Sequence, residues 1–135
     1  MSEAPRRIYV CFGETVEHLE ELQRCAKHGA HQGDWWTVNK NASEHDGVVF
    51  YMMAPLSSFV ATGTIAQKPR PVTSGEFIGK YRASMANIAM LSRPVHLHEA
   101  KAKFPDWSYL RALHNGSQPV PVALEDQFLE LLGTG

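Results

Sequence analysis

The sequence of 135 residues lacks several features that mark specialised classes of protein. Its two cysteines, Cys11 and Cys25, have no CxxC or other metal-ligand spacing, which argues against a disulfide scaffold and a cysteine metal site. No run approaches the ~20 apolar residues of a membrane span. The polar start, MSEAPRR, has no apolar region of the signal-peptide type. We therefore expect a cytoplasmic protein with no membrane partner, in which both cysteines are reduced and buried.

Common catalytic and cofactor motifs are also missing. There is no GxSxG, P-loop or GxGxxG in the sequence. The pairs His28/His31 and His96/His98 have the spacing of two metal ligands, but no third ligand follows by spacing. The sequence therefore predicts no cofactor, no metal and no recognisable catalytic group.

The charge distribution is uneven along the chain. The net charge of −1 argues against a strongly electrostatic nucleic-acid binder. Residues 39–103, however, carry eight Lys/Arg against four Asp/Glu, whereas both flanking parts are net acidic. A local basic patch of this kind could accept a phosphate backbone. A solvated surface with chance asymmetry explains the same counts, so charge alone does not decide.

Hydrophobic periodicity predicts an α+β protein. The 44% apolar content and the length indicate one globular domain over residues 1–135. The predicted elements, in chain order, are a strand at 6–12, a helix at 14–29, strands at 35–40, 47–53, 59–67 and 86–97, and helices within 98–113 and 121–132. No helix separates the strands from 35 to 97, so these should pair antiparallel. Gly63 predicts a bulge or a close backbone approach. The fold class expected is a small, curved, mostly antiparallel β-barrel with flanking helices.

The segment GDWWTVNKN, residues 33–41, combines two large rings with a polar run. Strand alternation places Trp35 and Trp36 on opposite faces, with Lys40 on the face of Trp36. Each ring taken alone is more typical of a core. Rings, amides and a lysine beside a basic segment are nevertheless what stacking on a nucleobase requires. One tryptophan should hold the barrel and the other, which we take to be Trp36, should serve a pocket.

The run WWTVNKNASEHDGVVFYMMAPLSSFVATGTIAQKPRP resembles the EVE-type branch of the PUA-like superfamily, and the stretch from RPVHLHEAKAKF to LEDQFLELL resembles the tail of that branch. The resemblance implies a small curved β-barrel with helices, related to the ASCH and YTH-like proteins. It also implies a reader that holds a modified base in an aromatic cage. By position, Trp36, Thr37, Asn39 and Lys40 fall in the pocket-forming segment, and Tyr51 ends the strand behind it.

The sequence therefore predicts a non-catalytic domain that binds RNA or DNA and accommodates a flipped, methylated base. The residues expected around the base are Trp35, Trp36, Thr37, Asn39, Tyr51, Tyr81 and Trp107. The residues expected to contact phosphates are Lys40, Arg82 and Arg93. The sequence leaves open the choice of RNA or DNA, the modification, the tryptophan that faces the pocket and the oligomeric state.

Two alternatives come from other functional classes. The first is a small ASCH-type amidohydrolase acting on an acylated nucleoside, in which Thr37, Lys40 and Glu44 would form the reactive set. The G-x-K-x-x-E-x-R signature of that branch is missing, so an enzyme is the less favoured reading. The second is a small-ligand or protein-interaction module on the same scaffold.

Overall fold

The computed structural model describes residues 7–28, 35–73, 75, 78–113 and 116–133, without the side chains of His28 and Trp35. Its strands are β1 (Ile8–Gly13), β2 (Trp35–Thr37), β3 (Gly47–Met52), β4 (Ser58–Ile65), β5 (Arg70–Pro71) and β6 (Tyr81–His96). Its helices are α1 (Val16–His28), α2 (Leu97–Lys103) and α3 (Glu125–Leu132), with 3-10 turns η1 (Ser108–Arg111) and η3 (Val122–Leu124). None of these described helices has the length and apolar content needed to cross a membrane.

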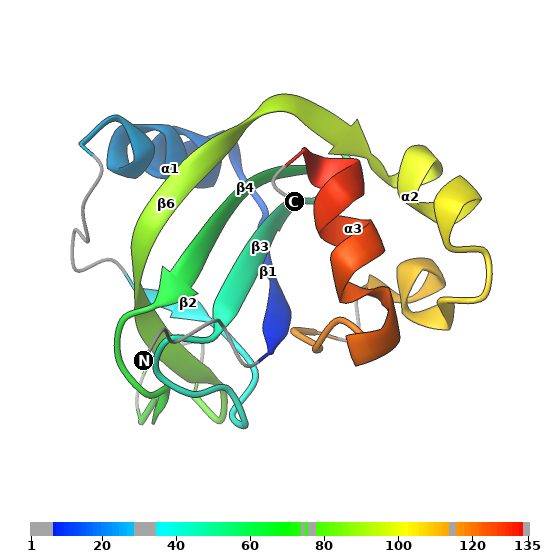
Figure 1. Cartoon of the computed structure of the whole chain (residues 1–135). Helices are drawn as coiled ribbons and strands as arrows, with labels where there is room; N and C mark the ends of the chain where they lie inside the picture. Colours follow the sequence, from blue (N-terminus) through cyan, green and yellow to red (C-terminus); the bar gives the residue numbers. More distant parts are fainter. Residues whose placement is uncertain (1–6, 29–34, 74, 76–77, 114–115, 134–135) are drawn as a thin grey trace, which may run out of the picture.

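The strands form one curled sheet in the order β1-β3-β4-β6-β2, and β5 pairs with β6 beside this path. Among the described strand pairs, only β1–β3 is parallel. Both α1 and β2 lie between these two strands in the sequence. The long β6 pairs with β4 along its later part and with β2 and β5 at its start, so it wraps the sheet into a nearly closed barrel (Figure 1). The predicted small, curved, mostly antiparallel barrel with flanking helices is confirmed.

Some boundaries of the strands between residues 35 and 97 differ from the predicted ones. The strand predicted at 86–97 begins earlier, at Tyr81, because its first residues pair with β2 and β5. The strand predicted at 35–40 ends at Thr37. The segment between the strands predicted at 59–67 and 86–97 contains the short strand β5. These differences arise from pairing between segments far apart in sequence, which hydrophobic periodicity does not report.

Residues 117–120 help to close the barrel wall between β1 and the chain that follows β2. The Val10 amide donates to the Gln118 carbonyl at 3.0 Å, and the Val120 amide donates to the Ile8 carbonyl at 2.7 Å. On the other side, Asn39 Nδ2 donates to the Ser117 carbonyl at 3.0 Å. This closing segment (residues 117–120) therefore ties a late part of the chain to two early ones.

The sheet separates two apolar clusters. The barrel core contains Trp36, Phe50, Met52 and Met85 together with Leu22 and Cys25 of α1. The helix-covered core contains Tyr51, Phe59, Trp107 and Phe128, under α2, η1 and α3, which lie on the other side of the barrel from α1 (Figure 1). All six residues of β3 are buried, because its alternate side chains enter different clusters.

At Gly63 the structure has both a bulge and a close backbone approach, the two features between which the sequence did not decide. The register between β4 and β6 shifts between Thr62 and Thr64, as at a bulge. A Cβ on Gly63 would lie 3.2 Å from the Ala86 carbonyl oxygen and 3.3 Å from a ring carbon of Phe50. The glycine thus lets β6 approach the barrel core closely at this point.

Both cysteines are free and buried, as predicted. Burial raises the pKa of the Cys11 thiol to about 12, and the Ser117 hydroxyl beside it lowers the pKa less than burial raises it. Burial also raises the pKa of Cys25. Protonated thiols are poor nucleophiles, so these cysteines act in packing.

Candidate functional site

Trp36 lies where the barrel core meets the surface. On β2 it pairs with Ala83 of β6, and its side chain is 7% exposed. From the inside, the ring of Phe50 packs against the indole with centroids 5.1 Å apart and planes at 65°. From the outside, the exposed imidazole of His18 lies 5.5 Å from the indole centroid. An exposed polar ring therefore covers this buried tryptophan.

The beginning of α1 fixes the position of His18. The Thr15 hydroxyl accepts the His18 amide at 3.4 Å, while His18 Nδ1 accepts the amides of Glu14 at 2.8 Å and Thr15 at 3.4 Å. This is a reciprocal capping box with histidine in the place usually taken by Glu or Gln. Because Nδ1 accepts, the neutral ring carries its proton on Nε2, which is then a donor beside Trp36.

Gly13 allows this arrangement by keeping the end of β1 small. A Cβ there would lie 2.5 Å from Met52 Sδ and 3.1 Å from His18 Cβ. Any larger residue would push α1 or Met52 away from its place. The contact between His18 and Trp36 thus depends on a glycine five residues earlier in the chain. Neither Gly13 nor His18 was predicted as a site residue, although Thr-x-x-His at a helix start was a usable signal.

Four other predicted residues lie around Trp36 on the same two strands or directly after them. Thr37 pairs directly with Arg82, and both are half-buried. Tyr81 is half-buried beside Arg82 on β6, and Lys40 is exposed in the turn that follows β2. The structure therefore brings Trp36, Thr37, Lys40, Tyr81 and Arg82 into one region. The side chain of Trp35 lies outside the described residues, so the division of roles between the two tryptophans stays a prediction.

Asn39 is engaged in holding the fold. Its Nδ2 donates to the Ser117 carbonyl, and its Oδ1 accepts the Asn41 amide at 2.8 Å, which closes an Asx turn. Both ends of the amide therefore have backbone partners. The closing segment and the turn after β2 are joined through this side chain.

Tyr51 and Trp107 lie in the helix-covered core, on the other side of the sheet from Trp36. Tyr51 makes edge contacts with Phe12 and Phe59, with centroids 6.2 Å and 5.0 Å away. Trp107 packs against Phe128 at 5.4 Å. The structure does not bring these two rings into a pocket with Trp36, because alternate residues of β3 face opposite sides of the sheet.

Arg93 lies near the end of β6 and forms a bidentate pair with Glu99 of α2. Its Nη1 and Nη2 donate to the two carboxylate oxygens at 2.9 and 3.1 Å. The Arg93 hydrogen bonds lower the pKa of Glu99, and the Glu99 carboxylate raises the pKa of Arg93. A phosphate would have to compete with this carboxylate.

Two of the three residues of the amidohydrolase alternative, Lys40 and Glu44, lie in water. Lys40 and Glu44 are both exposed, and a Glu44 oxygen lies 3.7 Å from His45 Nε2. A lysine nucleophile or base requires desolvation or a neighbouring cation to lower its pKa. The exposed position of Lys40 supplies no desolvation.

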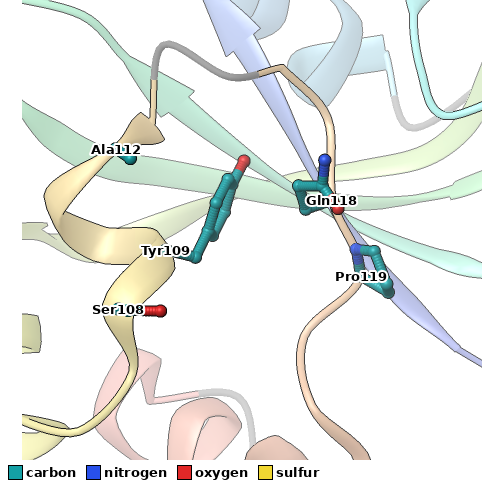
Figure 2. A pocket seen from close by; sticks show the side chains of 5 residues that line it. All are labelled: Ser108, Tyr109, Ala112, Gln118 and Pro119. Atoms are coloured by element: carbon teal, nitrogen blue, oxygen red, sulfur yellow. The ribbon is translucent and has the colours of Figure 1, made fainter.

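A cavity of about 390 Å³ lies between η1 and the closing segment. Figure 2 shows the Tyr109 side chain reaching from η1 toward Gln118, with Pro119 at the far wall. The Tyr109 hydroxyl donates to the Gly116 carbonyl at 2.7 Å, and burial raises its pKa above the ordinary value. The lining side chains are uncharged, and the cavity belongs to the helix-covered side rather than to Trp36.

No protein-family model matches the sequence, and no curated protein is significantly similar to it. Solved structures are similar over nearly the whole chain. A hypothetical protein from Leishmania major has a TM-score of 0.73 and 14% identity, over 94% of each chain. Human THYN1 in complex with DNA containing 5-methylcytosine has a TM-score of 0.62 and 15% identity, over 93% of this chain and 97% of that chain.

The YTH domain of the Zygosaccharomyces rouxii MRB1 protein, in complex with N6-methyladenosine RNA, has a TM-score of 0.56 and 14% identity, over 98% of this chain and 91% of that chain. Identities this low establish the fold and not the activity. The chain shares the fold of these structures, a small curved β-barrel with flanking helices, which is the fold that the sequence resemblance implied.

Proposed function

We propose that the protein is a non-catalytic reader that binds nucleic acid and holds one flipped, methylated base against Trp36. The observation that carries the proposal is the indole of Trp36, buried on one side by Phe50 and covered on the other by the exposed ring of His18. Two proteins of the same fold, THYN1 and an YTH domain, are in complexes with methylated DNA and methylated RNA. The shared fold supports the proposal, and the residues around Trp36 supply its chemistry.

The base would enter between Trp36 and the His18 ring. Stacking on an aromatic side chain contributes about 1–3 kcal/mol per base. The Nε2–H of His18 would donate to an acceptor on the base edge, because Nδ1 is held by the helix cap. A methyl group adds about 0.8 kcal/mol when it is buried against an apolar surface. The methyl group alone therefore gives a preference of about fourfold over the unmethylated base.

The cations beside β2 would hold the flanking phosphates. Lys40 follows β2 in the chain, and Arg82 lies opposite Thr37 on β6. Both can reach a backbone whose base has left the stack. Arg93 would have to leave Glu99 first, so its contribution should be smaller than that of exposed Lys40.

The test is a comparison of binding to oligonucleotides that differ by one methyl group. Fluorescence anisotropy would be measured with RNA and DNA strands that carry cytosine or 5-methylcytosine, and adenine or N6-methyladenine, at one salt concentration. The wild-type protein should prefer one methylated strand. Trp36→Leu should abolish that preference and weaken binding by about 1–3 kcal/mol.

Trp107→Leu is the matched control, because Trp107 has the same 7% exposure in the other cluster. It should destabilise the fold and keep the preference for the methylated strand. If Trp36→Leu bound both strands with wild-type affinities while remaining folded, the proposed site would be wrong. A wild-type protein with equal affinity for every matched pair would remove the reader function itself.

A further inference from the structure

The cavity between η1 and the closing segment has two facing walls. Ser108 and Tyr109 stand on the η1 side, and Gln118 and Pro119 stand on the other, with open space between the two pairs (Figure 2). Ala112, the C-cap of η1, completes the lining. The volume of about 390 Å³ lies within the range of small-molecule sites in proteins. What such a cavity can bind depends on how rigid its walls are and on the groups that they present.

Hydrogen bonds hold both walls in place. On the η1 side, the Tyr109 hydroxyl donates to the Gly116 carbonyl at 2.7 Å. On the other side, the Gln118 carbonyl accepts the Val10 amide at 3.0 Å, and Pro119 forms a bridge to β1. These bonds occupy the tyrosine hydroxyl and the main chain of the closing segment. A site whose walls are fixed in advance loses little conformational entropy when a ligand enters it.

Two polar side chains of the lining keep their hydrogen-bonding groups available. The carboxamide of Gln118 and the hydroxyl of Ser108 have no hydrogen-bond partner within the part of the chain that the structure describes. Gln118 is half-buried and Ser108 is exposed. A carboxamide offers both donors and an acceptor. Water satisfies such groups unless a ligand supplies the matching acceptor and donor.

The chemistry of the walls selects the charge and the shape of a ligand. The described lining residues are all uncharged, so an ionised ligand would lose hydration without gaining a counter-charge. The Tyr109 hydroxyl also stays neutral, because burial raises its pKa above the ordinary value. The rings of Tyr109 and Pro119 supply apolar surface for a flat molecule. The Gln118 carboxamide can form two reciprocal hydrogen bonds with another amide.

We propose that this cavity binds a small, uncharged aromatic amide, with its ring against Tyr109 and its amide hydrogen-bonded to Gln118 and Ser108. Nicotinamide is a simple molecule of this class. Tyr109 packs on the helix-covered core, whereas Trp36 belongs to the barrel core, so the cavity is a second site. The inference goes beyond the proposed function and does not depend on it.

The experiment is a titration of the whole protein with nicotinamide and, separately, with nicotinate, followed by the NMR signals of the backbone amides. Nicotinamide should cause saturable shifts at Ser108, Ala112 and Gln118. Nicotinate has the same ring with a carboxylate in place of the amide. It should bind about tenfold more weakly, because the cavity offers its charge no partner.

Two variants test the cavity itself. Gln118→Leu removes the carboxamide and keeps a side chain of similar size, so it should weaken nicotinamide binding about threefold to tenfold, the effect of one neutral hydrogen bond. Ala112→Leu places a larger side chain in the cavity and should abolish the shifts. Gln127→Leu makes the same exchange at an exposed position of α3 and is the matched control, with unchanged affinity. Circular dichroism would verify that all three variants fold.

The outcomes separate this site from the base site. Shifts that do not saturate, equal binding of nicotinate, or wild-type affinity in both cavity variants would overturn the amide site. Shifts centred on β2 and His18 would place nicotinamide against Trp36 and would overturn it as well. Trp36→Leu should leave nicotinamide binding unchanged. A protein that showed no preference for methylated strands would therefore lose the proposed reader function and keep the amide site.

Discussion

Trp36 and Trp107 are equally buried and have different surroundings. Each is 7% exposed, one in the barrel core and the other in the helix-covered core. Trp107 is contacted by the rings of Phe104, directly after α2, of Tyr109 in η1 and of Phe128 in α3. Trp36 has one buried ring, Phe50, on the inside and one exposed imidazole, His18, on the outside.

The comparison teaches that two side chains with the same exposed fraction can differ in the group that covers the ring. To reach Trp107, a ligand would have to displace several apolar side chains whose packing stabilises the fold. To reach Trp36 from the side of α1, a ligand would have to displace or join the ring of His18, which is exposed. The proposed site is thus the less costly of the two to open.

The largest expected effect comes from truncating each ring. Trp107→Ala should lower the free energy of unfolding by about 3–5 kcal/mol, because it leaves a cavity among aromatic neighbours. Trp36→Ala should cost less, because its outer side already borders hydrated His18. Urea unfolding followed by circular dichroism measures both values. Equal losses would break the comparison, since they would mean that Trp36 is enclosed as fully as Trp107.

The next largest effect concerns Phe50, which packs against the inner side of Trp36. Gly63→Ala places a methyl group against the Ala86 carbonyl and the Phe50 ring, so it should destabilise the barrel by about 1–3 kcal/mol. Because Phe50 supports the indole, the preference for a methylated base should also fall. Thermal unfolding and anisotropy would be measured on the same samples. A loss of stability with an unchanged preference would show that the position of Phe50 does not govern the site.

His18→Gln separates the contact of the His18 ring with Trp36 from the role of His18 in capping α1. Glutamine at this place can still accept the Thr15 amide in a capping box, so the free energy of unfolding should change little. The ring and its donor are lost, which should weaken binding of the methylated strand by about 0.5–1.5 kcal/mol. The matched control is Glu17→Gln, one residue earlier and exposed. An unchanged affinity in His18→Gln would assign His18 to capping alone.

The smallest expected effect is on the pH dependence of stability, and it concerns Glu125 on the helix-covered side. Burial raises the pKa of Glu125 on α3, Arg7 lowers it, and the carboxylates of Asp126 and Asp46 raise it further. A carboxyl whose pKa is higher in the folded state destabilises the fold when it is ionised. The loss of stability caused by the ionised Glu125 is present at pH 7. It disappears as the pH falls through the raised pKa of Glu125 toward the pKa of an exposed Glu. Glu125→Gln should therefore increase stability at pH 7, by about 0.5 kcal/mol or less.

The same measurement at pH 4 provides the internal control, because the two proteins should then be equally stable. Glu130→Gln, exposed on the same helix, is the matched control for the substitution itself. A stability gain in Glu125→Gln that persisted unchanged at pH 4 would contradict the ionisation argument. Binding of methylated strands should be the same in both variants, since α3 lies in the helix-covered core.

The sequence was sufficient for the architecture because local patterns and topology agree. The uninterrupted series of strands after residue 35 required antiparallel pairing, and Gly63 marked the place where β6 comes close. The position of Tyr51 could not be predicted in the same way. Every residue of GVVFYM is apolar or small and buried, so alternation gave no sign of which side of β3 faces the barrel.

The role of the candidate site stays a prediction. Trp36 and Thr37 of β2 pair with Ala83 and Arg82 of β6, so strand pairing brings these predicted segments side by side, and Lys40 lies in the turn that follows. Asn39 could not be separated from them by sequence, because its partner Ser117 is 78 residues away. His18 was overlooked because imidazole contacts depend on how α1 lies against the barrel, which Gly13 controls and no periodicity reports.

The closing segment has a consequence for how the chain reaches its native state. Residues 117–120 supply hydrogen bonds to β1 and to Asn39, so the wall beside β1 is incomplete until these residues have left the ribosome. Contacts between such distant parts of a chain form slowly. Until they form, the outer backbone groups of β1 remain hydrated and available to other strands. We therefore expect the emerging chain to gain protease resistance late in synthesis, in one step, rather than strand by strand.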